Sequence, residues 1–140
     1  MQAALRLLRL RDRTEAELTA ALSNKGFGDE AVGLVLKTLR DSHYVDDGRI
    51  AERAVEIANK RDPKGRLLIE EGLKQRGASE DAISAALVQI TDELQMAEDA
   101  FEKHRKPGDT PTRAAARLAR KGFDEDTVRT VIERHFPEFD

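Results

Sequence analysis

Residues 22–27 read Leu-Ser-Asn-Lys-Gly-Phe, and two similar stretches follow, Leu-Lys-Gln-Arg-Gly-Ala at 73–78 and Leu-Ala-Arg-Lys-Gly-Phe at 118–123. In each stretch a basic residue precedes a glycine, which is typical of a helix end. The cation suits the negative end of the helix dipole, and glycine adopts the left-handed backbone that follows the cap at no steric cost. We therefore predict that a helix ends with a positive φ angle at Gly26, Gly77 and Gly122.

Each glycine is followed by acidic or small polar residues and then by apolar residues at offsets shared by all three copies. Acidic residues favour a helix start, and apolar residues at i, i+3 and i+4 give a helix one buried face. These apolar positions are Val32, Val35 and Leu36 in the first copy, Ile83, Ala86 and Leu87 in the second, and Val128, Val131 and Ile132 in the third.

A third helical segment precedes each of these helix pairs, at about residues 3–11, 47–60 and 92–105, which makes nine helices. Helices of this length rarely stand alone in water, so each repeat must pack internally and against its neighbour. The sequence thus predicts an all-α protein of three tandem three-helix repeats, at residues 1–42, 43–91 and 92–140. Because the apolar residues are mainly alanine and short aliphatics, we expect an elongated row of thin modules and not one globular bundle.

The composition limits the classes of function open to this chain. Its 140 residues contain no cysteine, which excludes disulfides, thiolate nucleophiles and cysteine-based zinc sites. The formal charge of −3 argues against a strong, diffuse attraction to nucleic acid or membrane, so any basic surface must be local. Arginines interrupt the apolar runs near the N-terminus, which fits neither a signal peptide nor a membrane span. We expect a cytoplasmic monomer without a membrane partner.

Motifs that carry catalytic or metal chemistry are missing from the sequence. His43, His104 and His135 lie far apart and form no pair with ligand spacing. No serine lies in a G-x-S-x-G turn, and there is no phosphate-binding glycine loop. Asp46-Asp47-Gly48 lacks the further acidic ligands of a calcium loop, and we interpret it as the cap of the helix that begins near residue 47. We predict no catalytic residue, no metal site, no cofactor and therefore no enzyme.

Basic residues gather in three clusters in spite of the acidic net charge. The longest lies between residues 102 and 123 and contains Lys103, Arg105, Lys106, Arg113, Arg117, Arg120 and Lys121. The spacing of Arg113, Arg117 and Arg120 is i, i+4, i+7, so we expect one exposed stripe along a helix, whose loss costs little stability.

The two other clusters are shorter. Arg6, Arg9 and Arg13 have a similar spacing if the first helix extends that far, and Lys64 and Arg66 belong to the cluster at residues 60–66. All these basic residues are candidates for contact with phosphates or with an acidic protein surface. The alternative is that they only solvate amphipathic helices.

Several motifs of this chain resemble those of a known family. The run from Leu7 to Leu18, continued by Lys25-Gly26-Phe27, is similar to the opening repeat of the RecX family of recombinase regulators. The stretch Tyr44-Val45-Asp46-Asp47-Gly48-Arg49-Ile50-Ala51 resembles the family signature Tyr-Leu-Asp-Asp-x-Arg-Phe-Ala, with modest apolar exchanges at Val45 and Ile50. The middle repeat is matched from Lys64 to Ile69 and from Leu73 to Gly77, although Gly72 stands where an acidic residue is common. The third repeat is similar more loosely.

The resemblance implies three tandem three-helix repeats and a non-enzymatic modulator of the RecA recombinase. Proteins of this family bind RecA filaments on single-stranded DNA and restrain ATP hydrolysis, strand exchange and filament growth, within homologous recombination, DNA repair and the SOS response. Some members also bind DNA directly, so the expected partners are the RecA filament and, weakly, single- or double-stranded DNA. Two other hypotheses stay open: a stand-alone helical nucleic-acid-binding module, and a helical adaptor that binds proteins through apolar grooves.

Overall fold

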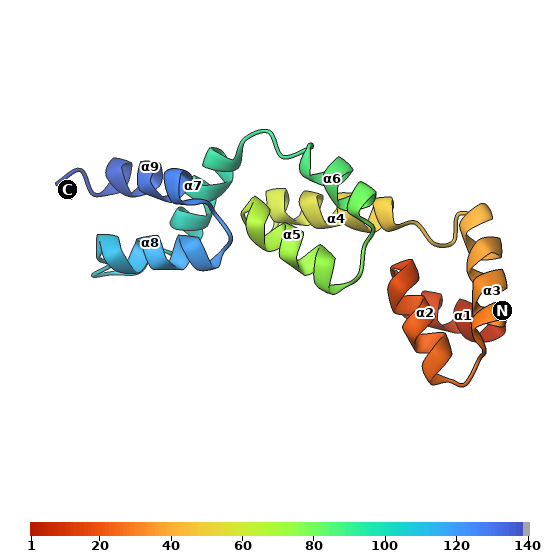
Figure 1. The fold of residues 1–140 in the computed structure, drawn as a ribbon. Coiled ribbons are helices and arrows are strands. Elements are labelled where there is room, and N and C mark those ends of the chain that lie inside the picture. Colours follow the sequence, from red (N-terminus) through yellow and green to blue (C-terminus); the bar gives the residue numbers. More distant parts are fainter. Residues whose placement is uncertain (139–140) are drawn as a thin grey trace. The chain divides into compact units, whose positions relative to one another are not determined.

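The structure, a computed structural model, describes residues 1–138 as a succession of α-helices. Within this range there are nine helices and no strand (Figure 1): α1 Gln2–Leu10, α2 Glu15–Asn24, α3 Asp29–Asp41, α4 Asp47–Lys60, α5 Arg66–Gln75, α6 Glu80–Leu87, α7 Glu93–His104, α8 Pro111–Arg120 and α9 Glu125–His135. The all-α class and the predicted number of helices are confirmed. The segments predicted ahead of each helix pair are α1, α4 and α7, with ends within one residue of the prediction.

The chain divides into two compact units, each assembled from two stretches of sequence. The first unit contains Met1–Arg53 and Leu73–Ala86, and the second contains Ala54–Gly72 and the chain from Leu87 onward. The division between the units therefore passes through α4 and α5 and before the last residue of α6. The repeat boundaries expected from the sequence stay a prediction.

The three glycines that follow α2, α5 and α8 have the predicted left-handed backbone. Their φ angles are 97° at Gly26, 77° at Gly77 and 93° at Gly122. In each copy the glycine amide donates to the carbonyl three residues back at 3.0 Å, and the next amide donates to the carbonyl five residues back at 3.1 to 3.3 Å. These two bonds form a Schellman motif, which satisfies carbonyls that the end of a helix would otherwise leave unpaired. The prediction of three glycine caps is confirmed.

A fourth cap of the same kind ends α3 without a glycine. His43 has a φ angle of 62°, the one positive φ outside glycine among the described residues. Its amide donates to the Arg40 carbonyl at 3.0 Å, and the Tyr44 amide donates to the Leu39 carbonyl at 2.8 Å. Histidine accepts this backbone better than most residues but still with strain. Without a glycine, no residue type marks this cap in the sequence.

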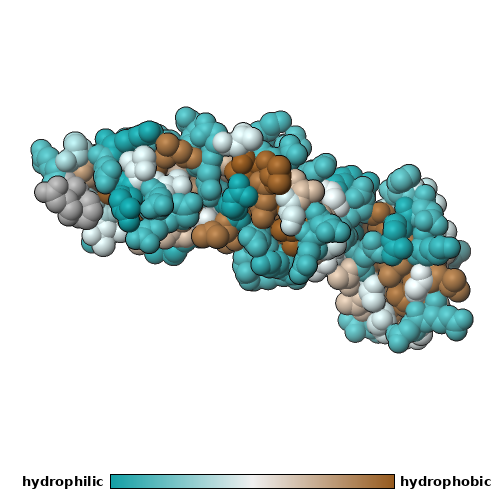
Figure 2. Space-filling model, turned by 45° about the horizontal axis from the view of Figure 1, so that its top comes forward, coloured by the Kyte–Doolittle hydropathy of each residue, from teal (hydrophilic) through white to brown (hydrophobic). Residues whose placement is uncertain are grey.

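Short aliphatic side chains fill the spaces between the helices. In the first unit the core contains Ala4, Leu18, Leu22, Val32, Leu39 and Val45. In the second unit α7, α8 and α9 pack together, and their buried residues include Met96, Phe101, Leu118, Val131 and Ile132. All the apolar positions predicted at i, i+3 and i+4 are buried or half-buried. Hydrophilic residues cover most of the face shown in Figure 2. None of the described helices is long and apolar enough to cross a membrane.

Side chains cap the helix starts and also join them. Thr14 and Glu17 form a capping box on α2, in which each side chain accepts a hydrogen bond from the other's backbone amide at 2.9 to 3.0 Å. The Asp47 carboxylate accepts from the amides of Glu15 and Ser79, both at 3.0 Å. The second aspartate of the signature thus links the starts of α2 and α6 to α4. Since Asp46 accepts from the amide three residues on at 3.2 Å, the interpretation of this stretch as a helix cap is confirmed.

Candidate partner-binding surfaces

The predicted arginine stripe lies on α8, but its central member is bound within the protein. Arg113 and Arg120 are exposed and form no ion pair with any residue of the described range. Arg117 lies with Nη2 2.6 Å and Nη1 3.0 Å from the two carboxylate oxygens of Asp109. The two side chains are only 19% and 9% exposed. The expectation of one exposed stripe is therefore wrong at Arg117, because spacing on a helix does not reveal an acid in the preceding loop.

The ion pair of Arg117 and Asp109 fixes the loop between α7 and α8. Hydrogen bonds from the Arg117 side chain and from the Lys106 amide lower the pKa of Asp109 from 3.8 to about 2. The same carboxylate raises the pKa of Arg117. A bidentate arginine pair of this kind is among the stronger charge contacts in proteins, and a partner can use Arg117 only by breaking it. Arg113 and Arg120 therefore remain the candidates on α8.

Two lysines of the same cluster also bind other residues of the second unit. The Nζ atom of Lys121 lies 3.0 Å from Oδ1 of Asp62, which lowers the pKa of that carboxyl. The Nζ atom of Lys103 donates to the Arg61 carbonyl at 2.7 Å. Both contacts tie residues of the α4–α5 loop to the third repeat.

The end of α7 carries one bound and one free cation. Arg105 lies 3.4 Å from the Glu102 carboxylate, and its guanidinium carbon is 5.4 Å from the centre of the Phe101 ring. The Lys106 side chain is exposed and forms no ion pair with the residues described here.

The N-terminal cluster divides in a similar way. Arg6 and Arg9 are exposed on α1 and have no ion-pair partner among residues 1–138. Arg13 lies beyond the end of α1 at Leu10, is half-buried, and donates from Nε to the Leu7 carbonyl at 3.2 Å. The helix spacing therefore does not extend to Arg13.

Lys64 and Arg66 hold the start of α5. The Lys64 Nζ atom lies 3.5 Å from Oδ2 of Asp62. Arg66 donates from Nη2 to the Ile90 carbonyl at 3.3 Å, and its amide donates to Glu93 Oε1 at 3.0 Å. The contacts of Arg66 give it a structural role, whereas the ion pair of Lys64 lies within the α4–α5 loop and is partly exposed.

We call the exposed and unpaired members of the predicted set the free basic residues: Arg6, Arg9, Lys106, Arg113 and Arg120. The others are held by carboxylates or carbonyls, several of them far away in sequence. Three exposed basic residues outside the clusters also have no ion-pair partner among the described residues: Lys25, Lys37 and Arg53. They stand singly in the sequence, so no local pattern marks them.

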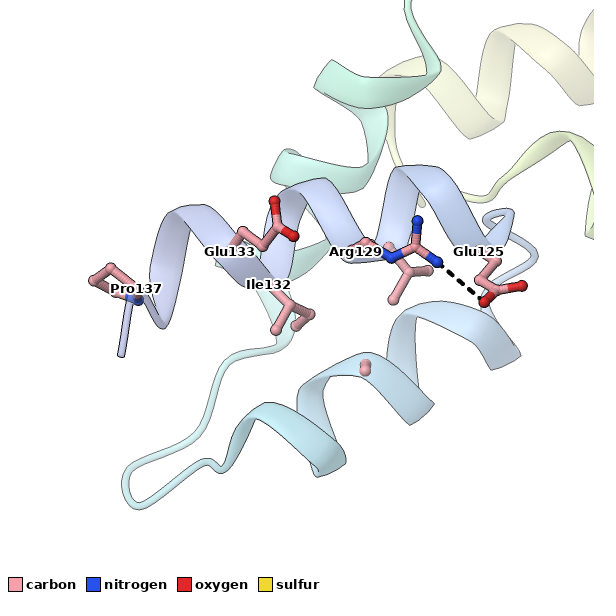
Figure 3. Close-up of a pocket in the computed structure, with 7 residues that line it drawn as sticks. Glu125, Arg129, Ile132, Glu133 and Pro137 are labelled. Atoms are coloured by element: carbon pink, nitrogen blue, oxygen red, sulfur yellow. Dashed lines mark hydrogen bonds and ion pairs between the residues drawn. The ribbon is translucent and has the colours of Figure 1, made fainter. Parts of the chain in front are cut away.

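A hollow of about 560 Å³ lies between α8 and α9 (Figure 3). Ala115, Val128 and Ile132 form its apolar part, and Ile132 points from α9 toward α8. Arg129 and Glu125 form an ion pair of 3.2 Å at its edge. Glu133 lines the same hollow, which therefore combines apolar and charged side chains.

His135 packs between helices. The Nε2 atom of His135 lies 2.6 Å from Oε2 of Glu98, and the imidazole stacks on Phe101 with ring centres 4.1 Å apart. These contacts join α9 to α7. Across the described residues, no three histidine or acidic side chains come together in a group that could hold a metal ion.

Comparison with known proteins identifies the family of this chain. A family model described as RecX, first three-helix domain, matches residues 1–39. The regulatory protein RecX of Chlorobaculum tepidum is 31% identical over 93% of this chain and 84% of its own length. The chain belongs to the RecX family. The resemblance seen in the sequence motifs is thereby confirmed.

Other RecX proteins support the same assignment. Regulatory protein RecX of Geobacillus kaustophilus is 34% identical over 94% of this chain, which spans about half of that relative, 52% of its length. A crystal structure titled regulatory protein RecX has a TM-score of 0.79 at 27% identity and covers 93% of this chain and 69% of its own. The crystal structure of RecX from Lactobacillus salivarius covers 95% of this chain and 92% of its own, with a TM-score of 0.82. At 23% identity the latter supports the RecX fold alone.

Proposed function

We propose that the protein regulates the RecA recombinase: it binds the filament that RecA forms on single-stranded DNA and restrains ATP hydrolysis, strand exchange and filament growth. Membership of the RecX family carries this proposal. The similarity to relatives named regulatory protein RecX extends over more than nine-tenths of the chain, well beyond the first three-helix domain. A regulator of this kind acts by binding and needs no catalytic residue of its own.

The free basic residues are the proposed contacts on this chain, with Arg113 and Arg120 first. Neither has an ion-pair partner among the described residues, so binding a phosphate or a carboxylate breaks no existing pair. Arg117 would have to leave Asp109. A filament on DNA presents a dense row of phosphates, which attracts local arginines even when the net charge of the protein is −3.

The test is a titration of the DNA-dependent ATPase of RecA with the wild-type protein and two charge-reversed variants. R113E/R120E reverses the free arginines of α8 and leaves the pair of Arg117 and Asp109 intact. K37E/R53E makes the same change of charge at two other exposed, unpaired positions. We expect R113E/R120E to need at least about tenfold more protein for half inhibition, since losing charge contacts costs well over 1.4 kcal/mol, the equivalent of tenfold. K37E/R53E should inhibit as wild type does.

Fluorescence anisotropy with labelled single-stranded DNA, in the absence of RecA, separates this proposal from a stand-alone nucleic-acid-binding module. A regulator of the filament inhibits the ATPase at concentrations where it leaves bare DNA unbound. Inhibition that follows occupancy of the bare DNA would favour the module, which the same exposed arginines support. A wild-type protein that leaves the ATPase unchanged would contradict the proposed function.

A further inference from the structure

Within the first unit, the end of α5 docks on the start of α2 through a small set of polar contacts. The carbonyl of Arg76, the residue before the glycine cap, accepts a hydrogen bond from Thr14 Oγ1 at 2.6 Å. The Arg76 guanidinium lies 2.9 Å from Oε1 of Glu17. Gly77 lies so close to Ala16 that an added Cβ would come within 2.6 Å of the alanine methyl.

The same kind of contact recurs within the second unit, where the end of α8 docks on the start of α5. The carbonyl of Lys121, again the residue before the glycine, accepts from the Gly65 amide at 2.8 Å. The Lys121 ammonium binds Asp62 at 3.0 Å. An added Cβ on Gly122 would come within 2.4 Å of Leu68.

The two contacts share one chemistry although their residues differ. A donor at the start of a helix, a threonine hydroxyl or a glycine amide, meets the carbonyl that precedes the glycine cap. A carboxylate near that start meets the basic side chain of the same residue, and the glycine allows close approach. The helix dipoles favour this arrangement, since the negative end of one helix faces the positive end of the next.

The cap after α2 has the same components, and no residue of the range 1–138 occupies it. We call Lys25, Gly26 and Phe27 the open cap. An added Cβ on Gly26 would meet no atom within 4 Å, and Lys25 has no ion-pair partner among the described residues. Phe27 is 46% exposed beside a hollow that Leu22 and Val32 help to line. By contrast, Phe123 at the equivalent position after α8 is only 3% exposed.

The start of α8 has the wrong chemistry to fill the open cap of a second copy. Pro111 occupies the first helical position and has no amide hydrogen, whereas at that position in α2 and α5 the amides of Glu15 and Arg66 donate hydrogen bonds to carboxylates. Arg113 takes the place of Glu17 and would face the like charge of Lys25. Head-to-tail association of this chain is therefore disfavoured.

We propose that the open cap is a docking surface for the start of an α-helix in a partner protein, one with serine or threonine at its N-cap and a carboxylate at the third helical position. The side-chain hydroxyl donates to the Lys25 carbonyl, the carboxylate pairs with the Lys25 ammonium, and apolar residues of the partner cover Phe27. The proposal rests on the two internal contacts and is independent of whether the partner is RecA.

The chain offers its own probe of this surface. The variant P111E/T112A/R113E gives residues 110–113 the side chains of residues 14–17, and so supplies the proposed occupant on another copy. Sedimentation equilibrium should show the average mass of this variant rising with concentration to twice the monomer mass or more. The protein concentration should reach roughly millimolar, because the two docking elements are on separate chains here and not joined by the backbone as in the internal contacts. Wild type, which lacks the occupant, should show no such rise.

Two added substitutions make the test specific. K25E in the triple variant should abolish the association, because it places like charges opposite each other. K37E makes the same change of charge at another exposed position and should leave the association in place. A triple variant with wild-type helicity that stays monomeric, or that associates equally with K25E, would overturn the proposal.

A second probe serves if the triple variant does not fold. A peptide with the sequence of residues 12–24 contains Thr14 and Glu17, and it should shift the amide resonances of Gly26 and Phe27 in wild-type protein. The same peptide should shift neither resonance in K25E. Unchanged resonances in wild type at millimolar peptide would also overturn the proposal.

Discussion

His43 shows how a single residue adds strain to this fold. It occupies the position that glycine takes in the caps of α2, α5 and α8, with the same two hydrogen bonds and a φ angle of 62°. A left-handed backbone costs a non-glycine residue about 1–2 kcal/mol, part of which the greater freedom of an unfolded glycine cancels. We predict that His43→Gly raises the free energy of unfolding by about 0.5–1 kcal/mol, as measured by urea denaturation. A less stable variant would mean that the imidazole makes a favourable contact.

Two acidic side chains should make the stability of the protein depend on pH. Burial raises the pKa of Glu17, but hydrogen bonds from Arg76 and the Thr14 amide and the charges of Arg76 and Arg11 outweigh it and lower the pKa from 4.5 to about 2. The hydrogen bonds to Asp109 lower its pKa from 3.8 to about 2. Both folded-state values lie below the unfolded ones, so their contributions are complete above the unfolded pKa values and vanish as the pH falls toward about 2.

We therefore predict that the urea midpoint of wild type falls steadily below about pH 5. Asp109→Asn removes one of the two groups and should flatten this dependence, while Asp99→Asn, an exposed site on α7 with no ion-pair partner among the described residues, should not. Equal pH dependence in wild type and Asp109→Asn would show that the pair with Arg117 does not form in solution.

At the scale of the helices, the three glycine caps have the same backbone conformation but different surroundings. An added Cβ meets nothing at Gly26, the side chain of Ala16 at Gly77, and the backbone of Leu68 at Gly122. We predict that Gly26→Ala costs about 1 kcal/mol for the backbone alone. Gly77→Ala should cost more, and Gly122→Ala most, because the added Cβ meets one atom of Ala16 at Gly77 but three atoms of Leu68, two of them backbone, at Gly122. Thermal unfolding of the three variants gives the order, and equal losses would contradict the close approaches at Gly77 and Gly122.

Gly72 weakens α5, and nothing in the structure explains why a glycine is present there. It lies exposed within the helix, and an added Cβ there would meet no atom within 4 Å. Glycine inside a helix is less favourable than alanine by about 0.5–1 kcal/mol. We predict that Gly72→Ala stabilises the protein by that amount in urea denaturation, with Gly33→Ala on α3, which is equally open, as the matched comparison. A loss of stability at Gly72 alone would contradict the open space that the structure shows around its Cβ position.

The structural features that could be predicted from the sequence are those marked by a pattern of neighbouring residues. The caps of a basic residue and a glycine, and the i, i+3, i+4 apolar pattern, involve residues within about ten positions of one another. The helix cap at Gly26 and the buried position of Val32 could therefore be predicted without a structure. The cap at His43 lacks its usual residue, and the ion pair of Lys121 with Asp62 joins residues that are distant in sequence. For the same reason the spacing on α8 predicted an arginine stripe but not that Arg117 is bound to Asp109. Periodicity locates a side chain on a helix face and leaves its long-range partner undetermined.

At the scale of the whole molecule, we propose a protein that acts by binding. It belongs to the RecX family, carries a net charge of −3, and presents single unpaired arginines where other basic residues are used in its own contacts. We expect a charge distribution of this kind to attract bare DNA weakly. Selective binding then requires a target whose surface contains both phosphates and protein. The central claim is thus that the RecA–DNA filament, and not DNA alone, is the target.

The most direct test of this claim is the equilibrium binding of fluorescently labelled protein to preformed RecA filaments on single-stranded DNA, compared with the same DNA free of RecA. We predict that the protein binds the filament at least about tenfold more tightly than bare DNA, a difference of about 1.4 kcal/mol. We also predict that binding weakens as salt rises and that R113E/R120E weakens it further, whereas K37E/R53E does not. Equal affinity for filament and bare DNA, or no binding to the filament at low salt, would contradict the proposed function.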